Sequence, residues 1–425
     1  MQLTFYVTDL PILTFEIDLE KRQSKLLSQD ANETIAKWVL KDRERTFEGI
    51  TRRLNELSNQ DLSLADLIDQ IKIQGLRADF QHQIKIGIDG QGPIAASQAY
   101  PQASRDGHLI SIKPGPAFGN TNSAGYQHKG AVMIEGRPYY LKLDDITPRS
   151  SRPWVDHFDY YYSSVSEAIV SAFVKALVPD PHFQSVAYDL VQVQLPGRTT
   201  TGCLAPNYVH ADELEIILAE GRWGYRYTVL EDIKIYRNDI HPLPAPEALD
   251  QLISLYQAQG VPADLAQYFL VQQLGFDLIT CNQDRFSNPS NYIMKLNIQS
   301  GQAVPINFDY GRCLGLVSWN DKFEAQITPD SEYYMEDVAD AAGGFQRIEN
   351  YLIPGNFEAK LAFLRERGYQ PIKYSLSSVI ASLDQVRENL KDLGPHFINF
   401  ANLKMDAFIQ HLQSDFCKNL LENID

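Results

Sequence analysis

Apolar and polar positions recur with clear periods along much of the 425-residue chain. Residues 3–18 alternate closely enough to predict a short pair of strands, with Pro11 near the break between them. From residue 32 to residue 73, apolar positions recur at spacings of three and four, which predicts helices. The chain therefore opens with a small α/β segment, in which we identify no catalytic chemistry.

The pattern changes in the middle of the chain. Residues 83–130 are rich in Gly, Pro, Ser and Asn, and a strand, a turn and a second strand follow. The later elements predicted from the pattern are a helix over 165–177, a strand over 184–194, a helix over 212–221, a pair of helices between 247 and 280, and mainly helices beyond 315. We expect the C-terminal helices to form the core of the larger part of the molecule.

Residues 276–311 are the most informative stretch. The pattern predicts the end of an apolar helix, a polar loop and two short strands that finish at a second acidic residue. Asp284 and Asp309 are placed where a hairpin brings them together, with Asn288 and Asn291 between them. In phosphoryl transfer, one Asp orients the attacking hydroxyl, and an Asn and a second Asp hold Mg²⁺ on the ATP phosphates. Loop capping and turn formation by Asp are the structural alternative.

Two charged residues upstream extend this interpretation. Lys142 lies in the predicted strand YYLKL, where a lysine either faces solvent at an edge or bridges the α- and β-phosphates of ATP. The second role requires a glutamate on a following helix, and Glu167 lies at the start of the helix predicted over 165–177. Arg285 is interpreted as a structural ion-pair partner within the loop. The Gly-rich segment before the strands lacks the Walker A spacing, but its backbone could approach phosphates closely.

Composition narrows the classes of function. The formal net charge of −16 argues against broad binding to nucleic acid or to an anionic membrane. The four cysteines are far apart and form no C-x-x-C pair, which argues against a zinc site or a disulfide framework. The start of the chain carries no secretory leader pattern, and no window approaches 18 apolar residues. We therefore expect a cytoplasmic protein with two or three domains.

Taken together, these motifs resemble those of the HipA-like kinases, bacterial serine/threonine kinases distantly related to protein and lipid kinases. Gly125-Tyr-Gln127-His-Lys129 is similar to the family's G-x-Q-x-K segment, with Thr121 and Ser123 just before it. The match spans residues 115–315, about half of the chain. The resemblance implies that Gly125, Gln127 and Lys129 bind ATP and that Ser123 or Thr121 is autophosphorylated.

The resemblance also assigns roles to the other motifs. It implies that Lys142 and Glu167 bind the nucleotide, that Asp284 is the catalytic base and that Asp309 binds Mg²⁺. The family has its metal-binding Asn five residues after the catalytic Asp, whereas this chain offers Asn291 at seven and Asn288 at four. Asn291 is the better candidate because Tyr-Ile-Met follows it as a strand should.

The fold that the resemblance implies is α+β and two-lobed, with a small β-rich N-lobe and a larger helical C-lobe. We expect an N-terminal accessory segment over 1–110, the N-lobe over 111–195 and the C-lobe over 196–425. The expected cofactors are ATP and Mg²⁺, and the expected partners are a protein substrate and an antitoxin-like regulatory protein, without nucleic acid or membrane. The alternatives are a kinase of small molecules or lipid headgroups, and a catalytically inactive binding module on the same scaffold.

Overall fold

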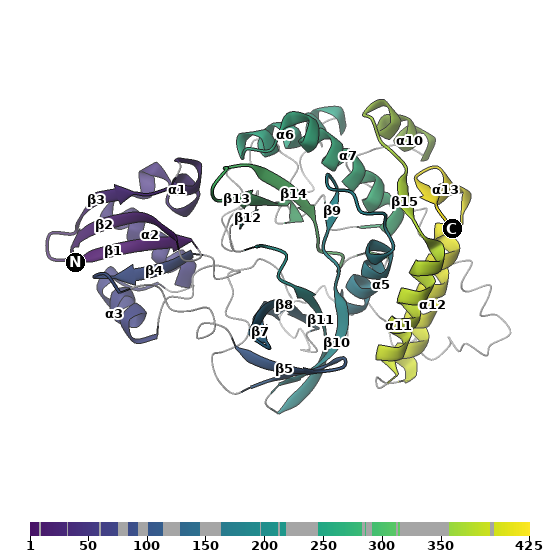
Figure 1. Ribbon diagram of the computed structural model, residues 1–425, viewed down its shortest axis with the longest axis horizontal. Coiled ribbons are helices and arrows are strands. Elements are labelled where there is room, and N and C mark those ends of the chain that lie inside the picture. Colours follow the sequence, from purple (N-terminus) through teal and green to yellow (C-terminus); the bar gives the residue numbers. More distant parts are fainter. Residues whose placement is uncertain are drawn as a thin grey trace, which may run out of the picture.

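The computed structural model describes most of the helices and strands of the chain. The described residues are 1–7, 10–31, 33–58, 61–74, 84–91, 101–113, 128–144, 163–195, 197–210, 213–217, 245–282, 285, 291–311, 313–314, 357–391 and 395–425. Helices and sheets are mixed along these ranges, which confirms the expected class at that level (Figure 1). Within them, no helix is both long enough and apolar enough to cross a membrane.

The N-terminal part is a four-stranded sheet in the order β3-β2-β1-β4, partly covered by helices. Its elements are β1 (Gln2–Val7), β2 (Leu10–Asp18), β3 (Gln23–Gln29), α1 (Glu33–Val39), a short 3-10 turn (Asp42–Glu44), α2 (Phe47–Ser58), α3 (Leu64–Gln74) and β4 (Ile84–Ile88). Leu3, Phe5 and Val7 alternate with less buried residues along β1 and pack in one core with residues of the three helices. The predicted strand pair and the helical segment that follows it are both confirmed.

A closed barrel forms the second unit, with strand order β10-β11-β8-β7-β5-β6. Its strands are β5 (Gln102–Asp106), β6 (Leu109–Ile112), β7 (His128–Ile134), β8 (Arg137–Leu143), β10 (Asp189–Leu195) and β11 (Arg198–Pro206). Leu141 and Leu143 belong to the small apolar cluster that fills the barrel. Because side chains alternate along a strand, Lys142 leaves the barrel on its outer face.

A second four-stranded sheet, in the order β12-β13-β14-β9, lies beside α7. Its strands are β9 (Gln184–Ser185), β12 (Glu213–Ile217), β13 (Ile293–Asn297) and β14 (Ala303–Asn307), and the neighbouring helices are α5 (Ser163–Lys175), α6 (Ala245–Ala258) and α7 (Ala263–Thr280). The helix predicted over 212–221 is wrong, because residues 213–217 pair antiparallel with β13. This pairing with a strand some 80 residues later overrides the local helical preference of a Glu- and Leu-containing stretch.

The C-terminal part is mainly helical, as predicted. Its elements are α10 (Phe357–Glu366), β15 (Ile372–Tyr374), α11 (Leu376–Leu390), α12 (Pro395–Leu412), α13 (Asp415–Lys418) and β16 (Leu421–Asn423). Helix α11 packs along α5, and Figure 1 shows the two side by side. The two-lobed arrangement and the division at residues 110 and 195 stay predictions. The strand pairing joins β5, β6 and β11 to the same barrel as β7, β8 and β10.

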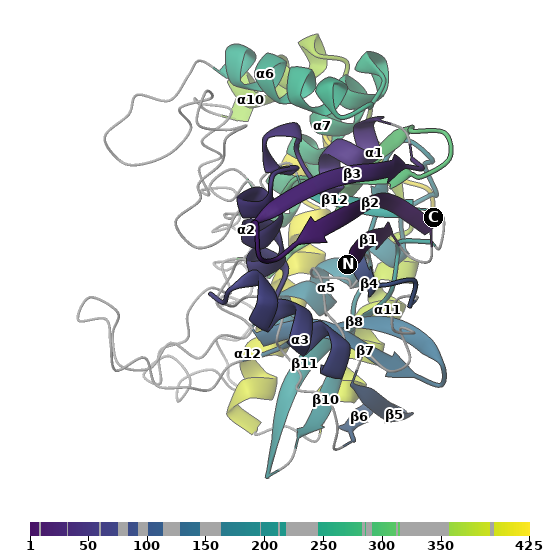
Figure 2. The same ribbon diagram turned by 90° about the vertical axis from the view of Figure 1, so that its left-hand side faces the viewer.

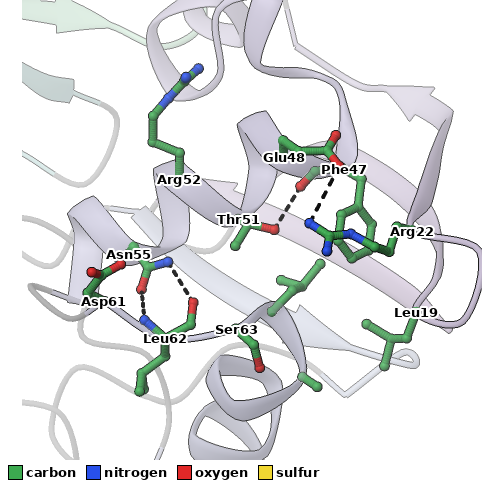
Figure 3. A pocket seen from close by; sticks show the side chains of 12 residues that line it. Leu19, Arg22, Phe47, Glu48, Thr51, Arg52, Asn55, Asp61, Leu62 and Ser63 are labelled. Atoms are coloured by element: carbon green, nitrogen blue, oxygen red, sulfur yellow. Dashed lines mark hydrogen bonds and ion pairs between the residues drawn. The ribbon is translucent and has the colours of Figure 1, made fainter.

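A pocket of about 490 Å³ lies in the N-terminal part, between the β2–β3 turn, α2 and the start of α3 (Figure 3). Several of its polar side chains contact one another or the backbone. Arg22 Nη2 lies 3.7 Å from Glu48 Oε1, and the Asn55 amide makes two hydrogen bonds with the backbone of Leu62. None of the site residues predicted from the sequence lines this pocket, so the candidate site is elsewhere.

Candidate active site

Lys142 is a buried lysine on the outer face of the barrel. Its side chain is 1% exposed, and its strand β8 runs between β7 and β11. In the strand register, Lys142 lies opposite Lys129 on β7 and Cys203 on β11. Directly opposed residues point to the same side of a sheet, so the two lysines share one face. A buried ammonium group is stable only if carboxylates or other acceptors surround it.

Two carboxylates supply these partners. Lys142 Nζ donates a hydrogen bond to Glu167 Oε1 of α5, and it donates another at 2.7 Å to Asp309 Oδ1, just after β14. Glu167 is completely buried, whereas the Asp309 side chain is 19% exposed. The structure therefore brings together three of the predicted site residues. Glu167 lies 25 positions after Lys142 in the sequence, and Asp309 lies 167 positions after it.

Helix α5 also fixes the backbone that follows Asp309. Glu167 Oε2 accepts a hydrogen bond from the Tyr310 N–H at 2.8 Å. The hydroxyl of Ser166 donates to the Tyr310 carbonyl at 2.6 Å and to the Cys313 carbonyl at 3.1 Å. One turn of helix thus positions both the lysine of the barrel and the Asp309 loop. Sequence reasoning missed Ser166, because a small polar residue in an amphipathic helix carries no signal of its own.

The Asp309 loop is tightly constrained. Asp309 has a φ of 62°, in the left-handed region that residues other than glycine rarely adopt. A Cβ atom at Gly311 would lie 2.8 Å from Ser163 Oγ, so a larger residue would displace the Ser163 hydroxyl at the start of α5. Cys281 and Leu314 also have positive φ angles, and the Leu314 N–H donates to the Thr280 carbonyl at 3.0 Å. Such clustered backbone strain is typical of functional sites.

The charged groups of this cluster shift one another's pKa values. Burial raises the pKa of Glu167 to about 7, even though the nearby Lys142 charge opposes the shift. Burial acts on Asp309 in the same sense, but the positive charges of Lys142 and Lys129 outweigh it and hold the pKa of Asp309 well below its ordinary value. Burial alone would lower the pKa of Lys142, and the charges of Asp309 and Glu167 raise it well above its usual range. Lys142 and Asp309 are therefore both charged at neutral pH.

Arg285 contacts three segments near this site: helix α7, the residues before β13 and the residues at the end of β14. Its guanidinium group is 2% exposed and contacts both carboxylate oxygens of Asp277 at 3.4 Å. It also donates to the Asn291 carbonyl at 2.9 Å, to the Phe308 carbonyl at 2.5 Å and to Asn307 Oδ1 at 2.7 Å. The interpretation of Arg285 as a structural ion-pair partner is confirmed.

Asp277, the acidic partner of Arg285, is buried in α7. Burial raises its pKa to about 6, while the Arg285 charge lowers it. Sequence reasoning missed Asp277, although an acidic residue within a helix that is buried on nearly all sides is a usable signal. Asn282 was missed as well, and its amide donates to the Asp309 carbonyl at 3.4 Å.

The remaining predicted residues divide into two groups. Asn291 is 1% exposed and lies two residues before β13, so a strand follows it as expected. Lys129 is on β7, and its charge acts on Asp309. Outside the described residues lie Asp284, Asn288, Gly125, Gln127, Ser123 and Thr121.

The donor set near Asp309 suits a hard cation. Arg285 donates to the carbonyl of Asn291, one predicted Mg²⁺ ligand, and to that of Phe308, the residue before the other predicted ligand, Asp309. Carboxylate and amide oxygens bind Mg²⁺, which usually takes one or two carboxylates and completes its shell with phosphate and water. Among the described residues, no group of three or more His, Cys, Asp or Glu could hold a metal ion. Asn291 and Asp309 carry oxygen donors of the type that Mg²⁺ prefers.

The comparisons with known proteins differ between sequence and structure. No protein-family model matches the chain, and no curated protein matches it by sequence. Among solved structures, the chain is similar to the proinflammatory kinase CtkA of Helicobacter pylori, with 12% sequence identity and a TM-score of 0.38. The match covers 71% of this chain and 96% of that chain.

Proposed function

We propose that this protein is an ATP- and Mg²⁺-dependent phosphotransferase that acts on Ser or Thr of a protein, as the HipA-like kinases do. The observation that carries the proposal is the contact of Lys142 with Glu167 and Asp309. A lysine held by a helical glutamate beside a metal-binding Asp is the arrangement that positions ATP phosphates in protein kinases. A purely structural ion pair would not require the strained Asp309 loop or the second lysine on β7.

In the proposed reaction, Lys142 binds the α- and β-phosphates, and Glu167 holds the ammonium group in place. Lys129, on the same face as Lys142, adds positive charge for the phosphates, and the resemblance assigns ATP binding to Gly125 and Gln127 as well. Asp284 accepts the proton of the substrate hydroxyl. The hydroxyl oxygen forms a bond to the γ-phosphorus, the bond from that phosphorus to the β–γ bridging oxygen breaks, and ADP leaves with the bonding electrons.

Asp309 would hold Mg²⁺ together with Asn291, or with Asn288 as the fallback. When bound, the ion supplies neutralisation of the negative charge on the phosphates. The chain's own contribution is positional, because Arg285 and α5 fix the backbone on either side of Asp309.

Autophosphorylation would regulate the activity of the proposed kinase. Phosphorylation of Ser123 or Thr121 would add negative charge where phosphates bind and would hinder ATP binding. An antitoxin-like partner is the regulatory protein that a HipA-like kinase implies.

Phosphate transfer from radiolabelled ATP in a cell extract tests the proposal. We expect labelled protein with wild type and Mg²⁺, and none with Asp284→Ala or Asp309→Ala. Equal labelling by wild type and both variants would overturn the kinase interpretation. Nucleotide binding without transfer would indicate a binding module, and transfer only to a small-molecule fraction would indicate another class of acceptor.

A further inference from the structure

The two edges of the N-terminal sheet differ. β4 forms one edge, and Ile84, Ile86 and Ile88 along it are at most 5% exposed. β3 forms the other edge, and all of its residues are exposed or half-buried. Figure 2, which faces the N-terminal part, shows β3 running across the front as the outermost strand of this sheet. In the part of the chain that the structure describes, no strand pairs with its outer side.

An exposed edge strand can pair with another chain unless its sequence prevents this. β3 has the sequence QSKLLSQ, which contains no proline and a single charge, Lys25. Leu26 is 37% exposed and Leu27 is 43% exposed. The edge is interrupted by one bulge, at which Leu27 has no partner on β2. β3 therefore presents an apolar centre, and the features that oppose edge-to-edge pairing along it are one lysine and one bulge.

The sequence of β3 reads almost the same in both directions. If two copies pair antiparallel about a two-fold axis at Leu26, Gln23 meets Gln29 and Ser24 meets Ser28 of the other copy. Leu26 then meets its own equivalent, and Lys25 meets Leu27. Amides thus face amides, hydroxyls face hydroxyls and the leucines gather at the centre, which is the self-complementarity that a two-fold interface requires.

We propose that this protein forms a two-fold homodimer through β3, which joins the two N-terminal sheets into one continuous sheet. The partner that pairs with this edge is a second copy of the chain, because the sequence of β3 is complementary to itself. A heterologous peptide would have no reason to require a near-palindromic edge. The proposal is independent of the phosphotransfer activity, since β3 contributes no residue to the candidate active site.

Sedimentation analysis of the full chain tests the proposal with a pair of matched variants. For wild type we expect the mass to rise with protein concentration from 48.2 kDa towards twice that value. Leu27→Lys places its ammonium opposite Lys25 of the other copy, and like charges opposed across strands are destabilising. Leu27→Glu loses the same apolar contact but places a carboxylate opposite Lys25. We therefore expect the lysine variant to stay monomeric and the glutamate variant to dimerise.

A cross-link tests the register directly. Residues opposed in an antiparallel pair have Cα atoms about 4.5–5.5 Å apart, which is within reach of a disulfide. Because the four native cysteines are buried, Leu26→Cys should give a disulfide-linked dimer under oxidation. Leu10→Cys, at a leucine that is 45% exposed on the neighbouring strand β2, should not. A wild-type monomer at every concentration, or equal behaviour of the two Leu27 variants, would overturn the proposal.

Discussion

Glu167 accepts a hydrogen bond from the Tyr310 N–H at 2.8 Å through one carboxylate oxygen and contacts the Lys142 ammonium group through the other. One buried side chain thus connects the barrel to the loop that carries Asp309. We expect replacement of residues in this cluster to change both stability and catalysis. Comparison of each variant with a matched control or double variant separates the two effects.

Replacement of Lys142 by Met leaves the buried carboxylate of Glu167 and the half-buried carboxylate of Asp309 without their cation. Removal of one partner from a buried ion pair typically costs about 3–5 kcal/mol, and we expect a loss of this size in urea unfolding together with loss of phosphate transfer. Lys175→Met is the matched control, because Lys175 and Asp189 form an exposed pair at 2.7 Å whose loss should cost at most about 1 kcal/mol.

The double variant Lys142→Met/Glu167→Leu separates stability from activity. It removes the uncompensated glutamate and should recover part of the lost stability, because apolar replacement of a buried ion pair is often tolerated. Transfer should remain absent. Activity in a stable double variant would show that Lys142 has no role with the nucleotide.

Gly311→Ala should destabilise the Asp309 loop. The new methyl group would lie 2.8 Å from Ser163 Oγ, and overpacking of this kind costs about 1–3 kcal/mol. Thermal unfolding should show the loss, and Ser163→Ala/Gly311→Ala should regain part of it because the hydroxyl is gone. If the double variant is no more stable than Gly311→Ala, the contact with Ser163 is not the cause.

Arg285→Lys should weaken the loop between α7 and β13. A single ammonium group cannot reach Asp277, Asn307 and the two carbonyls that the guanidinium group contacts together. We expect a raised KM for ATP with Mg²⁺ as well as lower stability, since Arg285 positions Asn291 and Phe308. Arg367→Lys is the control, because Arg367 pairs with Asp250 at the surface. An unchanged KM would limit Arg285 to a role in stability.

Stability should depend on pH through Glu167. Its pKa is raised from 4.5 to about 7, so the folded state holds this proton more tightly than the unfolded state. The stability associated with this carboxyl therefore falls as the pH rises from 4.5 to 7. The glutamine in Glu167→Gln cannot titrate. The unfolding free energy of wild type minus that of the variant should therefore fall as the pH rises from 4.5 to 7. A difference that is constant over the window, or that grows, would contradict the assignment.

Local patterns predicted several elements correctly. The apolar helix and the two strands before Asp309 follow the order read from residues 276–311, because each is set by its own period. The strand that carries Lys142 and the helix that carries Glu167 were found in the same way. Their contact was expected only because the motif order resembled that of a kinase family.

Other features depend on contacts that local sequence does not encode. Residues 102–112 look like part of a Gly- and Pro-rich segment, yet β6 within them pairs in parallel with β10 more than 80 residues later. The strand over 213–217 was predicted as helix because its pairing with β13 was not visible. The four contacts of Arg285 likewise join segments that only the folded chain brings together.

If the Lys142–Glu167–Asp309 cluster serves phosphoryl transfer and not only cohesion of the fold, Asp309 must carry its charge for the reaction. Asp309→Asn tests it most directly, because the amide keeps the shape of the side chain and can still accept a hydrogen bond from Lys142. The measurement is Mg²⁺-dependent transfer of labelled phosphate, with the melting temperature of the same samples. We expect a folded variant with transfer reduced by about 100-fold or more, the size expected when one preorganised charge is lost. A folded Asp309→Asn variant that transfers phosphate at the wild-type rate would contradict it.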